Sequence, residues 1–100
     1  MLNKKFLKTA EEVEVTFEYD ANGANSVDLL TEANGWQPIP MKKRKKDGVF
    51  YAKMRLPKDG RFQFRYLADG QKWTNDAAAD SFVLNGFGSH NGVVSTAPAG

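Results

Sequence analysis

The stretch Glu12-Val13-Glu14-Val15-Thr16-Phe17-Glu18-Tyr19 decides the fold, because apolar and polar residues alternate along its whole length. A period of two predicts a β-strand with one buried face and one exposed face. The exposed face is expected to be acidic, since three of its four polar positions are glutamates. The following segment, Asp20-Ala21-Asn22-Gly23, has the composition of a turn that ends the strand.

The same pattern recurs along most of the chain. Further strands are predicted at Val27–Leu29, Phe50–Leu56, Phe62–Ala68, Phe82–Leu84 and Val93–Ser95. Segments rich in Asp, Asn, Gly and Pro separate them, as expected for turns. No segment holds a convincing 3.6-residue apolar period, so no helix is expected beyond a single turn. We therefore predict an all-β fold, an immunoglobulin-like β-sandwich of about seven or eight short strands.

Four segments are expected to lie at sheet edges or in loops. The Pro38–Pro40 segment holds two prolines, which cannot donate to a strand ladder, so it should form an edge strand or a loop. Residues 4–7 are expected to form an N-terminal edge strand. Residues 71–79 and 85–92 are rich in small and polar residues and are predicted to be loops.

Length and composition indicate one small domain. The chain has 100 residues, of which 41% are hydrophobic and 26% are charged, as in ordinary globular proteins. We expect one domain over residues 1–96 and a flexible tail over residues 97–100. The absence of cysteine excludes disulfides and thiolate chemistry and fits a reducing cytoplasm. No run has signal-peptide or transmembrane character, so a soluble cytoplasmic protein is expected.

The basic charge is concentrated in one run. Lys42–Lys46 holds five of the 14 basic residues, which leaves nine basic against 12 acidic residues elsewhere, a balance of −3. Proteins that bind nucleic acid usually spread basic residues over a face, so neither nucleic acid nor a membrane is expected as a partner. The run is expected to be a solvated hairpin ending at Asp47-Gly48, and an anionic partner is the alternative. We expect a monomer.

Two tryptophans lie in polar surroundings. Trp36 follows Asn34-Gly35, and Trp73 follows the Asp69–Lys72 segment. An indole in such a segment either covers part of the core from a loop or is presented to a flat ligand. Because indole pairs a large apolar face with one N–H donor, it suits the apolar face of a sugar ring. The residues alone leave both alternatives open.

Two patterns together resemble carbohydrate-binding module family 48. The first is Val27-Asp28-Leu29-Leu30, then Asn34-Gly35-Trp36, then Ile39-Pro40-Met41; the second runs from Phe62 to Asp76 and includes Asp69-Gly70-Gln71-Lys72-Trp73. The resemblance covers roughly residues 13–95. That family includes the N-terminal domains of isoamylases and glycogen branching enzymes, and the glycogen-binding domain of the AMP-activated protein kinase β subunit. It implies a β-sandwich of the early-set type.

The resemblance also implies a set of residues that contact an α-1,4-glucan. They are Trp36, Arg65, Trp73, Phe87, Ser89 and Asn91. By this resemblance Trp36 and Trp73 stack on glucose rings, and Arg65 hydrogen-bonds sugar hydroxyls where the kinase-type domain has lysine. Phe87 packs across the sugars and is aromatic where the kinase-type domain has an aliphatic residue. Ser89 and Asn91 match a hydroxyl and an amide that contact the sugar.

Structural alternatives exist for several of these positions. By period two, Arg65 lies on the strand face opposite Phe64 and Tyr66, where it could simply be solvated and paired with a strand glutamate. Asn91 precedes Gly92, which is also a common turn sequence. The Lys42–Lys46 run is not a binding feature of the family.

Metal binding and catalysis are not expected. His90 is the only histidine and has no partners at ligand spacing, so no metal or other cofactor is predicted. Asp76 and Asp80 could pass as a glycosidase carboxylate pair, but a domain this small offers no deep cleft. Asp76 is instead expected to order the loop that carries Trp73.

The function expected from these observations is non-catalytic binding of an α-1,4-glucan, such as glycogen or starch, on a shallow surface. A separate glucan-active enzyme or kinase is a further expected partner. Two alternatives stay open: a protein-interaction scaffold, and an accessory domain associated with a glycoside hydrolase or a branching enzyme. The sequence carries no catalytic barrel, so a stand-alone module without enzymatic activity is expected.

Overall fold

The structure is a computed structural model that describes residues 2–6, 11–21, 23–86 and 88–97. The elements in these residues are β1 (Leu2–Phe6), β2 (Glu12–Tyr19), β3 (Val27–Thr31), the 3₁₀ helix η1 (Glu32–Asn34), β4 (Ile39–Pro40), β5 (Lys42–Lys43), β6 (Phe50–Pro57), β7 (Arg61–Ala68), β8 (Lys72–Thr74), β9 (Ser81–Leu84) and β10 (His90–Ser95). The predicted all-β class is confirmed. No helix in the described part of the chain has the length and apolar character needed to cross a bilayer.

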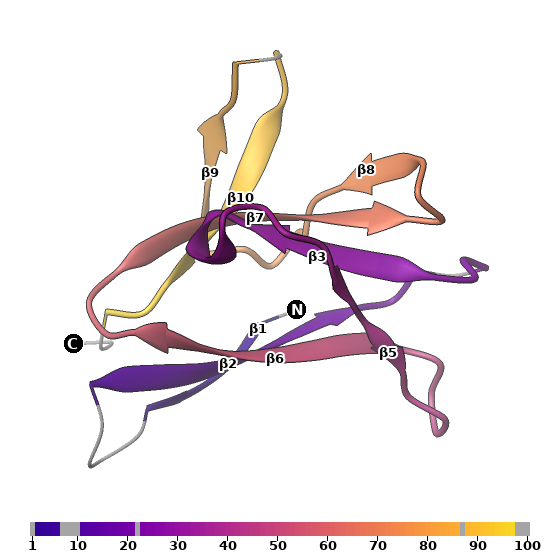
Figure 1. The fold of residues 1–100 in the computed structure, drawn as a ribbon, viewed down its shortest axis with the longest axis horizontal. Coiled ribbons are helices and arrows are strands. Elements are labelled where there is room, and N and C mark those ends of the chain that lie inside the picture. The colour runs from indigo at the N-terminus through magenta and orange to yellow at the C-terminus, as the bar shows by residue number, and fades with distance from the viewer. Residues whose placement is uncertain (1, 7–10, 22, 87, 98–100) are drawn as a thin grey trace.

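The strands form two antiparallel sheets that face each other (Figure 1). One sheet has the order β1-β2-β6-β5, and the other has the order β4-β3-β7-β10-β9, with β8 paired to β7. This arrangement is an immunoglobulin-like β-sandwich, as predicted. Ten strands are described rather than seven or eight, because β4, β5 and β8 are pieces of only two or three residues.

The core lies between the sheets and comes from alternate strand positions. Val13, Val15 and Phe17 of β2 are fully buried, while the residues between them are partly exposed. From the opposite sheet, Phe64 and Tyr66 are equally buried. The Phe17 and Phe64 rings meet edge to face with centroids 5.1 Å apart, an arrangement that adds to the free energy of area burial.

The predicted edges are confirmed. Ile39 and Pro40 form β4 at the edge of the larger sheet, where the missing proline N–H costs no ladder bond. The N-terminal strand β1 is an edge of the smaller sheet, and residue 7 of the predicted strand lies outside the described residues. The predicted tail is described only as far as Ala97, so the domain limits at 96 and 97 stay a prediction.

Both loop predictions were wrong in part. Residues 72–74 lie in the predicted 71–79 loop but form β8, and residues 90–92 lie in the predicted 85–92 loop but begin β10. The reason is tertiary: residues 72–74 pair with β7, whereas residues 90–92 pair with β9, and β10 joins β7 only from Gly92. Pairing with a neighbouring strand overrides the weak strand propensity of these polar residues.

Strand β7 changes its partner halfway along, and this creates a fork. Its first half pairs with β10 as far as Phe64, opposite Gly92. From Tyr66, opposite Thr74, the second half pairs with β8 instead, while β3 occupies the other edge. Figure 1 shows the β9–β10 hairpin and β8 diverging from β7. Arg65 lies at the position where the partner changes.

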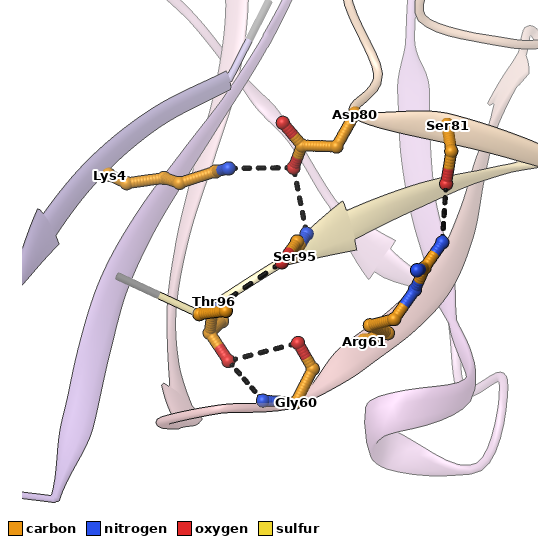
Figure 2. A network of polar contacts seen from close by, with 8 residues as sticks. Lys4, Gly60, Arg61, Asp80, Ser81, Ser95 and Thr96 are labelled. Carbon is orange, nitrogen blue, oxygen red and sulfur yellow. Dashed lines mark hydrogen bonds and ion pairs between the residues drawn. The ribbon is translucent and has the colours of Figure 1, made fainter. Parts of the chain in front are cut away.

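Polar contacts fasten the two sheets together near the chain ends (Figure 2). Lys4 of β1 donates to Asp80 Oδ2 at 2.6 Å, and the Ser95 amide of β10 donates to the same oxygen at 2.7 Å. The buried Thr96 hydroxyl accepts the Gly60 amide at 2.8 Å. These contacts hold the end of β10 against the turn between β6 and β7, and so help to fix the position of β10 beside β7.

Candidate functional site

A groove of about 500 Å³ lies over the fork in β7. The residues that line it are Trp36, Arg65, Trp73, Asn85 and Asn91. Four of them are among the predicted sugar-contacting residues, although they lie up to 55 positions apart in the sequence (91 − 36). The fold thus brings most of the predicted set together on one surface.

Trp36 is held by the backbone that follows η1. Gly35 has the left-handed conformation, with φ 72°, and donates to Glu32 O at 3.1 Å. The Trp36 amide then donates to Thr31 O at 2.8 Å. These two bonds form a Schellman motif, which explains why Asn34-Gly35 precedes the indole. Trp36 itself has a φ of 64°, a strained value for a bulky residue, and its side chain is 39% exposed.

Trp73 lies in the middle of β8, opposite Leu67 of β7. The side chain is 49% exposed, although the residue belongs to a strand of the larger sheet. The alternative in which the indole covers the core is therefore wrong for Trp73. The guanidinium carbon of Arg65 lies 5.4 Å from the centroid of the Trp73 ring, within cation–π range. Arg65 and Trp73 are therefore neighbours in the groove.

Arg65 is partly buried beside the groove, and most of its donors are unused. Its Nη1 donates to Ser89 Oγ over a long 3.4 Å, and its Nε is buried without a hydrogen-bond partner. Among the described residues Arg65 forms no ion pair, so the predicted alternative of pairing with a strand glutamate is not observed. A guanidinium has five N–H donors, so this one retains donors for a ligand.

An amide network forms the other side of the groove. Asn91 is buried; its Nδ2 donates to Gln63 Oε1 at 2.9 Å, and its Oδ1 accepts from Asn85 Nδ2 at 3.2 Å. Asn85 Nδ2 also lies 2.9 Å from Ser89 Oγ. Asn91 is thus a strand residue with an occupied amide, not the turn residue of the alternative, and Ser89 lies between Asn85 and Arg65.

Sequence reasoning missed Gln63 and Asn85. Gln63 shares its strand face with Arg65 by period two, a signal that could have identified it. Asn85 begins the connection between β9 and β10, and only the fork places it opposite Arg65. The predicted contact residue Phe87 lies outside the described residues.

Asp76 orders the turn that follows β8, rather than a loop that carries Trp73, since Trp73 lies in the strand. Its Oδ1 accepts the Ala78 amide at 2.8 Å, and its Oδ2 accepts the buried Tyr66 hydroxyl at 3.0 Å. Burial and the Asp76 carboxylate raise the pKa of Tyr66 far above its usual value, so the phenol stays a donor. Asp80 is engaged with Lys4 and Ser95, so the two carboxylates have separate structural roles.

A second hollow, of about 540 Å³, lies between β2 and the segment after β8. Its lining includes Glu18, Tyr19, Arg44 and Asp76, and it contains no tryptophan. Arg44 is bound there to Glu18 at 2.7 Å. The smaller groove over the fork is the better candidate, because two indoles that are each more than a third exposed and a guanidinium without an ion pair line it.

No protein-family model and no curated protein matches the chain. Among solved structures, it is similar to the crystal structure of the enterobactin esterase FES from Shigella flexneri in the presence of 2,3-di-hydroxy-N-benzoyl-serine, with a TM-score of 0.72 and 15% sequence identity. The match covers 98% of this chain and 33% of the esterase chain, so this chain spans about a third of that protein's length. At this identity the likeness shows the fold alone.

Proposed function

We propose that this domain binds α-1,4-glucans without catalysis, in the groove over the β7 fork. The observation that carries the proposal is the meeting of Trp36 and Trp73, both more than a third exposed, around one groove with Arg65. Single exposed apolar residues are common on protein surfaces, but two indoles around one groove are not. The resemblance to carbohydrate-binding module family 48 supports the same residues.

The mechanism divides between stacking and hydrogen bonding. Trp36 and Trp73 supply apolar surface for the faces of glucose rings, and Arg65 donates to hydroxyl or ring oxygens. Each hydrogen bond contributes only about 0.5–1.5 kcal/mol net, because sugar hydroxyls are well solvated before binding. Stacking therefore provides much of the free energy of binding. The affinity for one short oligosaccharide should be roughly micromolar to millimolar, and a polymer with many sites gains by avidity.

The direct test is a ¹⁵N-HSQC titration of the domain with maltoheptaose. We expect saturable shifts of both indole N–H signals, accompanied by backbone shifts of Arg65 and Asn91. The backbone amide signals of residues 45 and 46, in the basic hairpin, serve as an internal control and should not move. Absence of any saturable shift at millimolar maltoheptaose would contradict the proposal.

The alternative of a protein-interaction domain has one observation in its favour. Phe82 and Leu84 of the edge strand β9 are 45% and 71% exposed, although they are large apolar residues. If maltoheptaose moves neither indole signal, this edge becomes the first surface to test for a docked protein. An accessory role beside a larger enzyme is compatible with either function.

A further inference from the structure

The charge of Arg65 is not balanced within the groove. None of the lining residues carries a carboxylate; besides Arg65 they are indoles and amides. Glu32 accepts the backbone N–H of Gln63 at 2.7 Å through its Oε2, but it does not line the groove. Arg65 is therefore a partly buried cation that faces neutral side chains.

The other arginines of the chain are placed differently. Arg44 binds two carboxylates, and Arg55 lies 4.0 Å from Glu12. Arg61 is exposed and donates to Ser81 Oγ at 2.8 Å. Arg44 is partly buried as well, but only Arg65 combines partial burial with the lack of a carboxylate partner and a buried Nε without a hydrogen-bond partner. A buried donor without a partner has a free-energy cost, so Arg65 is the arginine that the protein itself satisfies least.

We propose that the groove is selective for a glucan that carries an anionic substituent, such as a phosphate monoester, and that Arg65 pairs with this group. This inference rests on the proposed glucan binding and adds the class of ligand. Neutral hydroxyl groups can accept from the guanidinium, but they leave its charge unbalanced. A phosphate accepts two parallel N–H bonds from the planar fork and also neutralises it.

The placement of Arg65 beside Trp73 supports the same assignment. The guanidinium carbon lies 5.4 Å from the Trp73 ring centroid, so an anion bound to Arg65 and a sugar in contact with the indoles would share one groove. A free phosphate ion would gain the charge interaction but not the stacking. The structure therefore favours a ligand in which the anion and the sugar belong to one molecule.

The test compares maltoheptaose with maltoheptaose that carries one glucose 6-phosphate, by calorimetric titration of the full chain. The phosphorylated sugar is expected to bind about tenfold more tightly at low salt, because its contact with Arg65 is charge-assisted. Raising the ionic strength from about 0.01 M to about 1 M, where the Debye length falls to about 3 Å, should remove most of this difference. Inorganic phosphate alone is expected to bind far more weakly.

Three variants locate the effect. Arg65→Gln should abolish the preference for the phosphorylated sugar and should also weaken maltoheptaose binding, because Arg65 donates to the neutral sugar as well, whereas Arg61→Gln, on the same face of β7, should keep the preference. Arg65→Lys keeps the charge without the planar fork and covers the case in which the glutamine variant does not fold. It should retain only part of the preference.

Each remaining outcome has one meaning. Equal affinity of the two oligosaccharides would overturn the anionic selectivity and leave the proposed glucan binding intact. Binding of neither sugar would overturn both. If inorganic phosphate bound as tightly as the phosphorylated sugar, the groove would be an anion site to which the glucan contributes no affinity. That result would also overturn the inference.

Discussion

The groove and the basic hairpin use their arginines in opposite ways. In the hairpin, Arg44 Nη1 lies 2.7 Å from Glu18 and Nη2 lies 2.8 Å from Asp47. These hydrogen bonds, Asp47 first, raise the pKa of Arg44 far above its usual value. In the groove, Arg65 has one long hydrogen bond and no carboxylate partner among the described residues. The number of charges in a stretch of sequence is thus a poor measure of how much charge is available to a ligand.

The largest effect is expected at Trp73. Trp73→Ala should weaken maltoheptaose binding at least about 30-fold, the factor of a hot-spot truncation, because it removes a stacking surface. The variant should stay folded, since the indole is 49% exposed. The matched control is the hairpin double variant Lys45→Gln, Lys46→Gln, whose affinity should change less than about twofold. If calorimetry showed a larger loss of maltoheptaose affinity in the hairpin variant than in Trp73→Ala, the hairpin and not the groove would be the surface that binds the glucan.

Two left-handed glycines offer a matched pair. Gly35 has a φ of 72° and Gly48 a φ of 73°, and a Cβ at either meets no close contact. Alanine at either position should therefore lower the free energy of unfolding by about 1 kcal/mol through backbone strain. Only Gly35→Ala should also reduce glucan affinity, by a few-fold, because Trp36 follows directly. Urea unfolding and maltoheptaose titration of both variants check this. Equal affinities of the two variants for maltoheptaose would mean that the Schellman motif does not position the Trp36 indole.

The two arginines should separate stability from binding. Arg44→Gln removes the partner of two carboxylates and is expected to lower the unfolding midpoint slightly, with glucan affinity unchanged. Arg65→Gln should leave the midpoint near that of the parent, because no ion pair is lost. Thermal unfolding followed by circular dichroism measures both. A larger loss of stability in the Arg65 variant would show that its guanidinium is structural.

The smallest effect is a pH dependence confined to the hairpin. The hydrogen bond from Arg44, followed by that from the Val49 amide, holds the pKa of Asp47 below its usual range. A carboxyl whose pKa is lowered by folding stabilises the protein above its unfolded pKa of about 3.9. This contribution is lost as the pH falls through the lower folded pKa. The stability difference between the parent and Arg44→Gln should therefore be constant from neutral pH down to about 4 and shrink below it. Urea unfolding of both proteins from neutral pH to below pH 4 measures this difference in the free energy of unfolding. A difference that stayed constant over the whole range would show that Asp47 is not involved.

Much of the fold was predictable because its signals are local. Alternation over Glu12–Tyr19 and Phe62–Ala68 predicts which side chains enter the core, and the structure buries most of these positions, with Tyr19 and Phe62 only partly buried. The short strand β8 and the start of β10 were not predictable in this way. Residues 72–74 form a strand because they pair with β7, and residues 90–92 because they pair with β9; both pairings are properties of the assembled sheet.

The site was predictable residue by residue but not as an arrangement. Polar flanks and a family resemblance pointed to Trp36, Trp73 and Arg65, and all three line the groove. Asn91 lines the groove, but its side-chain amide is hydrogen-bonded to Asn85 and Gln63, so it holds the groove together as well as facing it. No local signal marks Asn85, because its place beside the groove depends on the angle between two hairpins.

The Schellman motif before Trp36 has a consequence for the timing of binding. Its two backbone hydrogen bonds set the indole in place before a ligand arrives, so no ordering step is needed on encounter. Association with a preformed site is limited mainly by collision and orientation, and differences in affinity then appear in the dissociation rate. A weak site of this kind releases its ligand quickly. On a branched glucan polymer, rapid release and recapture would let the domain move between neighbouring glucan chains while staying on the same polymer molecule.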